Sequence, residues 1–175
     1  MKHTVAALVE DRPGVLNRVA SLFRRRGFNI DSLAVGTTEE AGISRMTIVV
    51  DGPEWVGDQV EKQLDKLIDV LTVETLSEDD AVVRELALIK VAARPDQRRE
   101  ILDIIEIFRA QVVDVSTTTL VVQLTAAAST LDALIENLRP YGIREMVRTG
   151  RIALARGAKT TAIHEHEEAE SKRFH

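Results

Sequence analysis

The strongest constraint on the fold is the order of apolar patterns along the chain, because the same order occurs twice. In each half, two segments with the i, i+3, i+4 apolar spacing of an amphipathic helix lie among runs typical of strands. The clearest helix is expected to begin at Val15 and to end at Gly27. Arg24–Arg26 occupy its last turn, where cations interact favourably with the helix dipole. The order strand–helix–strand–strand–helix–strand predicts a βαββαβ unit.

The second half repeats this order, which indicates an internal duplication. A short match supports it, since Phe23 precedes the strand around Ile30 at the same spacing as Phe108 precedes the strand around Val115. The expected elements are strands at 5–9, 28–35, 46–50, 70–76, 86–91, 112–115, 120–124 and 143–147, and helices from 15, from 54, from 95 and from a cap at Ser129 or Thr130.

We therefore predict an α+β protein with two ferredoxin-like βαββαβ domains, each an antiparallel sheet with helices on one face. The N-terminal domain is expected over 1–76 and the C-terminal domain over 81–157, with the acidic linker 77–80 between them. Residues 158–175 are charge-dense and lack a sustained apolar stripe, so we expect a solvated helix or a disordered end there. We expect a dimer that forms either edge to edge or through the helix faces, because an open sheet leaves edges that a second copy of the chain could pair.

Composition narrows the classes of function. The 175 residues carry a net charge of −5, the wrong sign for a protein whose main task is to bind a phosphate backbone. Aromatic residues make up 3% of the chain, so RNA binding by base stacking on a sheet lacks its side chains. The chain has no cysteine, which excludes disulfides, thiolate zinc sites and cysteine nucleophiles. We expect no nucleic-acid partner.

Hydropathy gives no indication of a membrane or export segment. No stretch reaches 18 continuous apolar residues, the minimum for a membrane-spanning helix. The apolar run at 5–9 is too short for the core of a signal peptide and lacks a cleavage site. We expect a cytoplasmic protein without a membrane partner.

The sequence contains no recognisable catalytic constellation. Ser44 has no histidine near it, and three of the four histidines, His164, His166 and His175, lie at the end of the chain. His164 and His166 are two positions apart and would not share a helix face, which argues against a metal site. Phosphate-binding loops, paired carboxylates and nucleophile elbows are absent as well. We expect neither catalytic nor metal-binding residues, and we expect the chemistry to belong to a partner.

One turn has the properties of a ligand site. The run Asp11–Gly14 joins a strand to a helix, and its glycine lets the backbone approach another group closely. Free N–H groups at the following helix start can hold an anion such as a carboxylate. Asn29 begins the next strand, and its amide offers both donors and an acceptor, which suits a zwitterion. A helix start and a turn asparagine without any ligand would explain the same residues.

These segments resemble the small regulatory subunit of acetolactate synthase, also called acetohydroxyacid synthase. The resemblance covers residues 3–157 and is most specific in the first half, which matches the N-terminal ACT domain of that family. It is carried by residues 9–16, 22–33, 44–48 and 61–70 in the first half and by 84–91 and 106–110 in the second.

The resemblance implies a non-catalytic subunit in branched-chain amino acid biosynthesis. Members bind a large catalytic subunit, raise its activity and convey feedback inhibition by valine or a related amino acid. No cofactor is expected in this chain, while thiamine diphosphate and FAD are expected only in the catalytic partner. The resemblance also implies a homodimer through the ACT domain. Two alternatives stay open: a stand-alone ACT-type amino-acid sensor, and a small acylphosphatase-like enzyme.

In the family, the effector lies between the ACT domains of two subunits. Carried over to this sequence, the effector-binding residues are Asp11, Gly14, Val15, Leu16, Asn29 and Ile30. Gly14 and the amides after it would bind the effector carboxylate, Asn29 would bind its polar end, and apolar neighbours would surround its side chain. Asp11 departs from the family pattern, because many members have asparagine there. A carboxylate at this position would attract the effector ammonium and repel its carboxylate.

Overall fold

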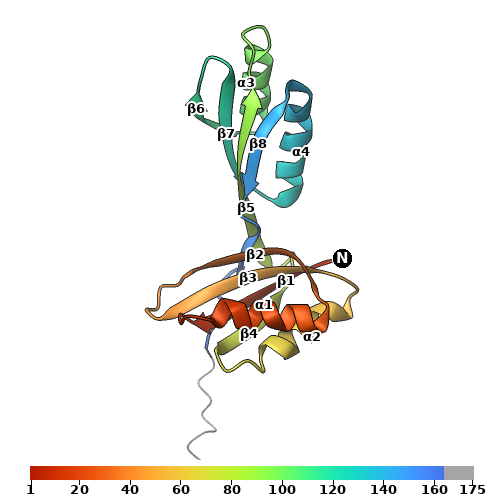
Figure 1. Ribbon diagram of the computed structural model, residues 1–175, viewed down its shortest axis with the longest axis vertical. Helices are drawn as coiled ribbons and strands as arrows, with labels where there is room; N and C mark the ends of the chain where they lie inside the picture. The colour runs from red at the N-terminus through yellow and green to blue at the C-terminus, as the bar shows by residue number, and fades with distance from the viewer. Residues whose placement is uncertain (164–175) are drawn as a thin grey trace, which may run out of the picture. The chain divides into compact units, whose positions relative to one another are not determined.

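The computed structural model describes residues 1–163, which form two compact units (Figure 1). The first unit comprises Met1–Val82 together with the described residues from Ala153 on, and the second comprises Val83–Ile152. The first contains β1 (Lys2–Glu10), α1 (Val15–Arg26), β2 (Asn29–Thr37), β3 (Ile43–Asp51), α2 (Trp55–Leu64) and β4 (Val70–Leu76). The remaining elements are β5 (Ala81–Ala92), α3 (Arg98–Ile107), β6 (Gln111–Val115), β7 (Thr119–Ala126), α4 (Ala128–Leu138), the 3₁₀ helix η1 (Arg139–Tyr141), β8 (Ile143–Arg148) and β9 (Ile152–Ala155).

The two units share one topology. The first sheet has the strand order β2-β3-β1-β4 and the second has β6-β7-β5-β8, so strands of equal rank occupy equal places. All neighbouring strands in these two orders pair antiparallel. This arrangement confirms the predicted pair of ferredoxin-like βαββαβ domains.

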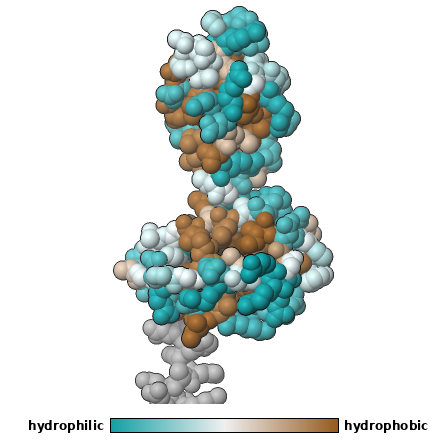
Figure 2. All heavy atoms as spheres, viewed as in Figure 1, coloured by the Kyte–Doolittle hydropathy of each residue, from teal (hydrophilic) through white to brown (hydrophobic). Residues whose placement is uncertain are grey.

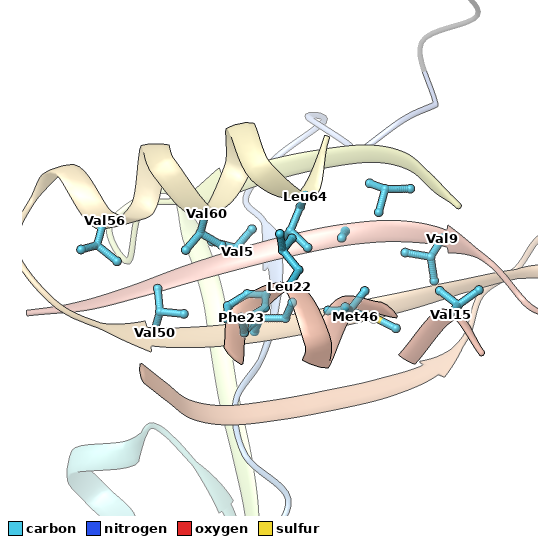
Figure 3. Packing of buried hydrophobic residues seen from close by; sticks show 14 residues of the cluster. Val5, Val9, Val15, Leu22, Phe23, Met46, Val50, Val56, Val60 and Leu64 are labelled. Carbon is cyan, nitrogen blue, oxygen red and sulfur yellow. The ribbon is translucent and has the colours of Figure 1, made fainter. Parts of the chain in front are cut away.

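The core of the first unit lies between its sheet and its two helices (Figure 3). Apolar residues that alternate along β1 and β3 face α1 and α2, and each helix contributes the residues spaced three and four apart along its buried side. Phe23 is almost fully buried and meets the ring of Phe28 edge to face, with 5.8 Å between ring centroids. Each large apolar side chain buried in this way contributes roughly 1.5–3 kcal/mol to stability.

Helix α1 begins and ends where the sequence predicts. Gly14 precedes the helix and Gly27 follows it, and both have left-handed backbone angles, with φ of 86° and 69°. The N–H of Gly27 donates to the carbonyl oxygens of Phe23 and Arg24, which satisfies acceptors that the helix end would leave open. The helix therefore has sharply defined ends, and the turn before it has a fixed shape.

Four features of the second half differ from the sequence prediction. Helix α3 begins at Arg98 rather than at residue 95. Helix α4 begins at Ala128 after an extended Ala127, so Ser129 and Thr130 lie inside its first turn, and neither caps it. Strand β5 begins at Ala81 rather than at residue 86, and the four-residue strand β9 was not expected. The first residues of β5 follow the acidic linker and include charged residues, so the alternation of apolar and polar residues is not clear there. Strand β9 is too short for any periodicity to be recognised.

The described residues beyond 152 return to the first unit. Strand β9 pairs with β5, and the N–H of Arg156 donates to the carbonyl oxygen of Asp80 at 2.8 Å. The Arg45 guanidinium donates to the carbonyl oxygen of Ala153 at 2.9 Å, and Lys159 pairs with Glu74 at 2.5 Å. Ala153 is 4% exposed. The second compact unit thus ends at Ile152, and the segment that follows it packs on the first unit.

Candidate functional site

The turn between β1 and α1 is held by backbone hydrogen bonds to two neighbouring loops. The N–H of Asp11 donates to the carbonyl oxygen of Gly42 at 2.8 Å, and that of Glu10 donates to the carbonyl oxygen of Asp69 at 2.9 Å. Among residues 1–163, no side chain caps the start of α1. The N–H of Val15 donates to the carbonyl oxygen of Arg12 at 3.4 Å, which leaves the N–H groups of Leu16 and Asn17, among the described residues, to an anion.

A buried carboxylate organises the charges beside this turn. The side chain of Asp69 is 4% exposed and accepts hydrogen bonds from Nη2 of Arg12 at 3.2 Å and from Nε of Arg18 at 2.5 Å. Arg12 also pairs with Glu10. A carboxylate buried to this extent is stable only when charged or hydrogen-bonding partners compensate it, and the two arginines meet this requirement.

The predicted turn residues have different roles in the structure. Val15 is 3% exposed and packs in the core, and its backbone N–H donates to the carbonyl oxygen of Arg12 at 3.4 Å, so its side chain does not reach a ligand and its N–H is already partnered. Leu16 is 48% exposed and can offer an apolar surface. Asp11 is exposed, and Gly14 has the positive φ that brings its backbone to the surface of the turn.

The other predicted residues lie where β2 begins. Asn29 is exposed and pairs with Asp51 of β3, while the side chain of Ile30 is half-buried against the core. Asn29 also lines a cavity of about 410 Å³. The cavity is lined by Arg26, Gly27, Phe28, Asn29, Asp51, Gly52, Pro53, Trp55, Val56, Gln59 and Gln63.

Charged groups also surround this end of the sheet. The α-ammonium group of Met1 donates to Asp51 at 3.1 Å, and this hydrogen bond, assisted by Lys2, lowers the pKa of the Asp51 carboxyl. Lys2 pairs with Asp31 at 2.9 Å. Asn29 therefore stands beside a carboxylate that is ionised and already partnered.

Within one chain, the two groups of predicted residues lie at opposite ends of the sheet. Glu10 pairs with Ile43 at one end of β1, and Lys2 pairs with Asp51, the partner of Asn29, at the other. A nine-residue strand spans about 26 Å, and a helix of 12 residues spans about 18 Å. A single amino acid cannot bridge this gap.

The serine and histidines considered for catalysis or metal binding do not form a site in the described residues. Ser44 is buried in β3, and His3 directs its Nε2 to the carbonyl oxygen of Pro53 at 2.9 Å. His164, His166 and His175 lie outside the described residues. Across 1–163, no group of three or more histidines, cysteines and carboxylates is placed to hold a metal ion. Nor is any helix of this part long and apolar enough to cross a membrane.

Sequence reasoning missed Arg18 and Asp69. Arg18 reads as one of several polar residues on the exposed side of an amphipathic helix, and Asp69 reads as part of a loop before a strand. The two residues are 51 positions apart, and only the fold brings them together.

Fold and turn together are those of a domain of the ACT class. Residues 5–72 match the family described as the AHAS small subunit-like ACT domain, and residues 84–157 match the family described as the small subunit of acetolactate synthase. The chain belongs to the acetolactate synthase small-subunit family, as the resemblance in the sequence indicated.

Relatives and a solved structure support this assignment over nearly the whole chain. The chain is 54% identical to a probable acetolactate synthase small subunit of Archaeoglobus fulgidus, over 91% of this chain and 99% of that protein. It is 51% identical to the acetolactate synthase small subunit of Bacillus subtilis, over 93% and 95%. The crystal structure of the small subunit from Thermotoga maritima superimposes with a TM-score of 0.85 at 40% identity, over 91% and 99%.

Proposed function

We propose that this chain is the non-catalytic regulatory subunit of a thiamine-diphosphate-dependent acetolactate synthase. It binds a branched-chain amino acid, valine first among the candidates, raises the activity of the large catalytic subunit and conveys feedback inhibition. Membership of the small-subunit family and the ACT class of the first unit support this proposal. Thiamine diphosphate and FAD belong to the catalytic partner in this scheme.

The observation that carries the proposal is the separation of the two half-sites. Strand β2 forms an open edge of the first sheet, and apolar side chains gather on the surface of this unit around it (Figure 2). If β2 pairs antiparallel with β2 of a second copy about its middle residue, Leu33, then Asn29 lies opposite Thr37 of the other chain. Thr37 pairs with Ser44, next to the end of β1 where the turn begins.

Such a dimer would assemble two complete sites. Each would combine the Gly14 turn of one copy with the Asn29 end of the other. Backbone N–H groups at the start of α1, those of Leu16 and Asn17 first among them, would bind the effector carboxylate. The oxygen of the Asn29 amide and the Asp11 carboxylate would accept hydrogen bonds from its ammonium group. The exposed part of Leu16 would contact its aliphatic side chain.

Regulation then follows from thermodynamic linkage. An effector bound across the two copies favours the arrangement in which both half-sites meet. It can change the activity of the catalytic subunit only through a difference in affinity for two arrangements of the complex.

The test combines effector binding with reconstitution. The full chain is titrated calorimetrically with valine, leucine and isoleucine, and activity is measured with the large catalytic subunit. We expect Asn29→Ala and Gly14→Asp to abolish effector binding and feedback inhibition while activation persists. Asn137→Ala makes the same chemical change on the exposed side of α4. It should leave effector binding, feedback inhibition and activation unchanged.

Two results would contradict the proposal. Unchanged effector binding in both site variants would overturn the assignment of the turn and Asn29. Binding of an amino acid without association with a large catalytic subunit would instead favour a stand-alone sensor.

A further inference from the structure

Arg18 lies beside the turn in a fixed position. Its backbone N–H makes the first hydrogen bond of α1, to the carbonyl oxygen of Gly14 at 3.0 Å. Its Nε is held by the buried carboxylate of Asp69 at 2.5 Å. A Cβ atom built on Gly14 would lie 3.1 Å from Nη1 of Arg18. The guanidinium group therefore rests against the bare side of the glycine while its side chain stays half-exposed.

The two arginines of the cluster are neutralised to different degrees. Arg12 has two carboxylate partners, Glu10 and Asp69, whereas Arg18 has Asp69 alone among residues 1–163. Arg18 donates to Asp69 through Nε. In the described part of the chain its two Nη groups have no acceptor, so both can donate to a ligand. The result is a cation that is anchored at one edge and open at the other, beside the uncapped start of α1.

We infer that Arg18 binds the carboxylate of the effector and that Asp69 positions it. This inference rests on the proposed function and adds a residue to its site. The guanidinium lies beside Gly14, the residue that precedes the first N–H groups of α1, so a carboxylate bound at this turn would accept from both. The inference also accounts for Asp11, because a cation next to the turn offsets the repulsion between the Asp11 carboxylate and that of the effector.

The geometry gives Gly14 a second role. A side chain at this position would enter the space between the turn and the guanidinium, and an acidic one would pair with Arg18 itself. Arg18 would then be withdrawn from the effector even if the turn kept its backbone shape.

The experiment compares valine with valinamide, which keeps the ammonium and the side chain but has no carboxylate. Affinities of the full chain for both ligands are measured by calorimetry, with valinamide also used as a competitor. Discrimination between the two ligands reports the carboxylate contact, whereas a purely structural Arg18 would affect both ligands equally.

The expected result is specific to the charge of Arg18. The Arg18→Gln variant should bind valine at least about tenfold more weakly than the unaltered chain does. Its affinity for valine should then be no higher than the affinity of the unaltered chain for valinamide. Arg18→Lys keeps the charge but cannot hold Asp69 and the ligand at once, so it should show intermediate discrimination. Asp69→Asn should also give intermediate discrimination between valine and valinamide, because an amide holds Nε of Arg18 less firmly than a carboxylate does. Arg25→Gln removes an exposed arginine from the last turn of the same helix and should change nothing.

The outcomes separate this inference from the proposed function. If the unaltered chain binds none of the branched-chain amino acids, the proposed function fails. If it binds valine and Arg18→Gln keeps the full preference for valine over valinamide, the role of Arg18 is overturned while the proposed function stands. An equal loss of both ligands in Arg18→Gln, with no recovery in Arg18→Lys, also overturns it.

Discussion

At the scale of single residues, the two glycines that flank α1 show how one backbone conformation can serve two purposes. Gly14 and Gly27 both have positive φ. A Cβ on Gly27 would meet nothing within 4 Å, whereas one on Gly14 would press on the Arg18 guanidinium. Gly27 is therefore needed only for the shape of the chain, while Gly14 is also needed for the space beside it.

Alanine at each glycine should separate these two requirements. Both substitutions place a Cβ in the left-handed region, so each should lower the free energy of unfolding by about 1–2 kcal/mol in urea titrations. Only Gly14→Ala should also weaken valine binding, because the methyl group displaces Arg18. Equal valine affinities in Gly14→Ala and Gly27→Ala would contradict this account.

At the scale of elements, a cluster of charged side chains connects β5, β8 and α4 in the second unit. Glu85 of β5 is buried and accepts hydrogen bonds from Arg148 of β8, which also donates to Asp132 of α4 at 2.7 Å. Burial alone would lower the pKa of Arg148, but the hydrogen bonds to Asp132 and Glu85 outweigh it and raise the pKa above its ordinary value. The cluster resembles Asp69 with its two arginines in having a buried carboxylate at its centre.

Removing the cation should destabilise the second unit strongly. Arg148→Met leaves Glu85 buried without its partner, which we expect to lower the free energy of unfolding by about 3–5 kcal/mol. Arg139→Met breaks an exposed pair with Glu136 on α4 and should lower it by less than about 1 kcal/mol. Chemical unfolding monitored by circular dichroism measures both, and similar losses would contradict the prediction.

The long helices and strands with clear end signals were predictable from the sequence, and the short ones were not. Helix α1 carries a four-residue buried stripe between two glycines, and both its boundaries were foreseen. Strand β9 has four residues and only Ala153 is buried, so no period marks it. The residues of the candidate site differed in the same way. The turn was visible as local sequence, whereas the contact of Arg18 with Asp69 depends on tertiary packing.

At the scale of the whole molecule, the segment from Ala153 stabilises the sheet of the first unit. Arg45 is half-buried and its pKa is lowered by desolvation, and its donation to Ala153 holds this segment in place. Lys159 and Thr161 both bind Glu74 of β4. The first unit is therefore completed by chain that follows the second one.

Shortening the chain tests this dependence. Ending it after Ile152 should speed hydrogen exchange in β1 and β3 and lower the unfolding temperature of the first unit, while exchange in β7 changes less. Ending it after Ile163 keeps all the contacts described above and serves as the control. Equal protection of β1 and β3 in the two shortened chains would contradict the role of this segment.

Dimer formation provides a second test at this scale. Ala34 of β2 lies one residue from the expected two-fold axis, so Ala34→Glu would bring like charges together and should weaken both the dimer and valine binding. Ala133→Glu adds the same charge to exposed α4 and should not. Sedimentation velocity with and without valine measures this, and valine should tighten the dimer of the unaltered chain. A dimer of equal strength in both variants would contradict pairing through β2.

The return of the chain through β9 also has a consequence for engineering and evolution. In topological terms, the second unit is an insertion: the chain leaves the first unit after Val82 and re-enters it at Ala153. A single proteolytic cut at either crossing would leave two pieces held together only by the packing of the segment from Ala153 on the first unit. An exchange of the second unit between relatives would likewise need two junctions. A chimera joined at the acidic linker alone would also exchange the segment from Ala153, which completes the first unit.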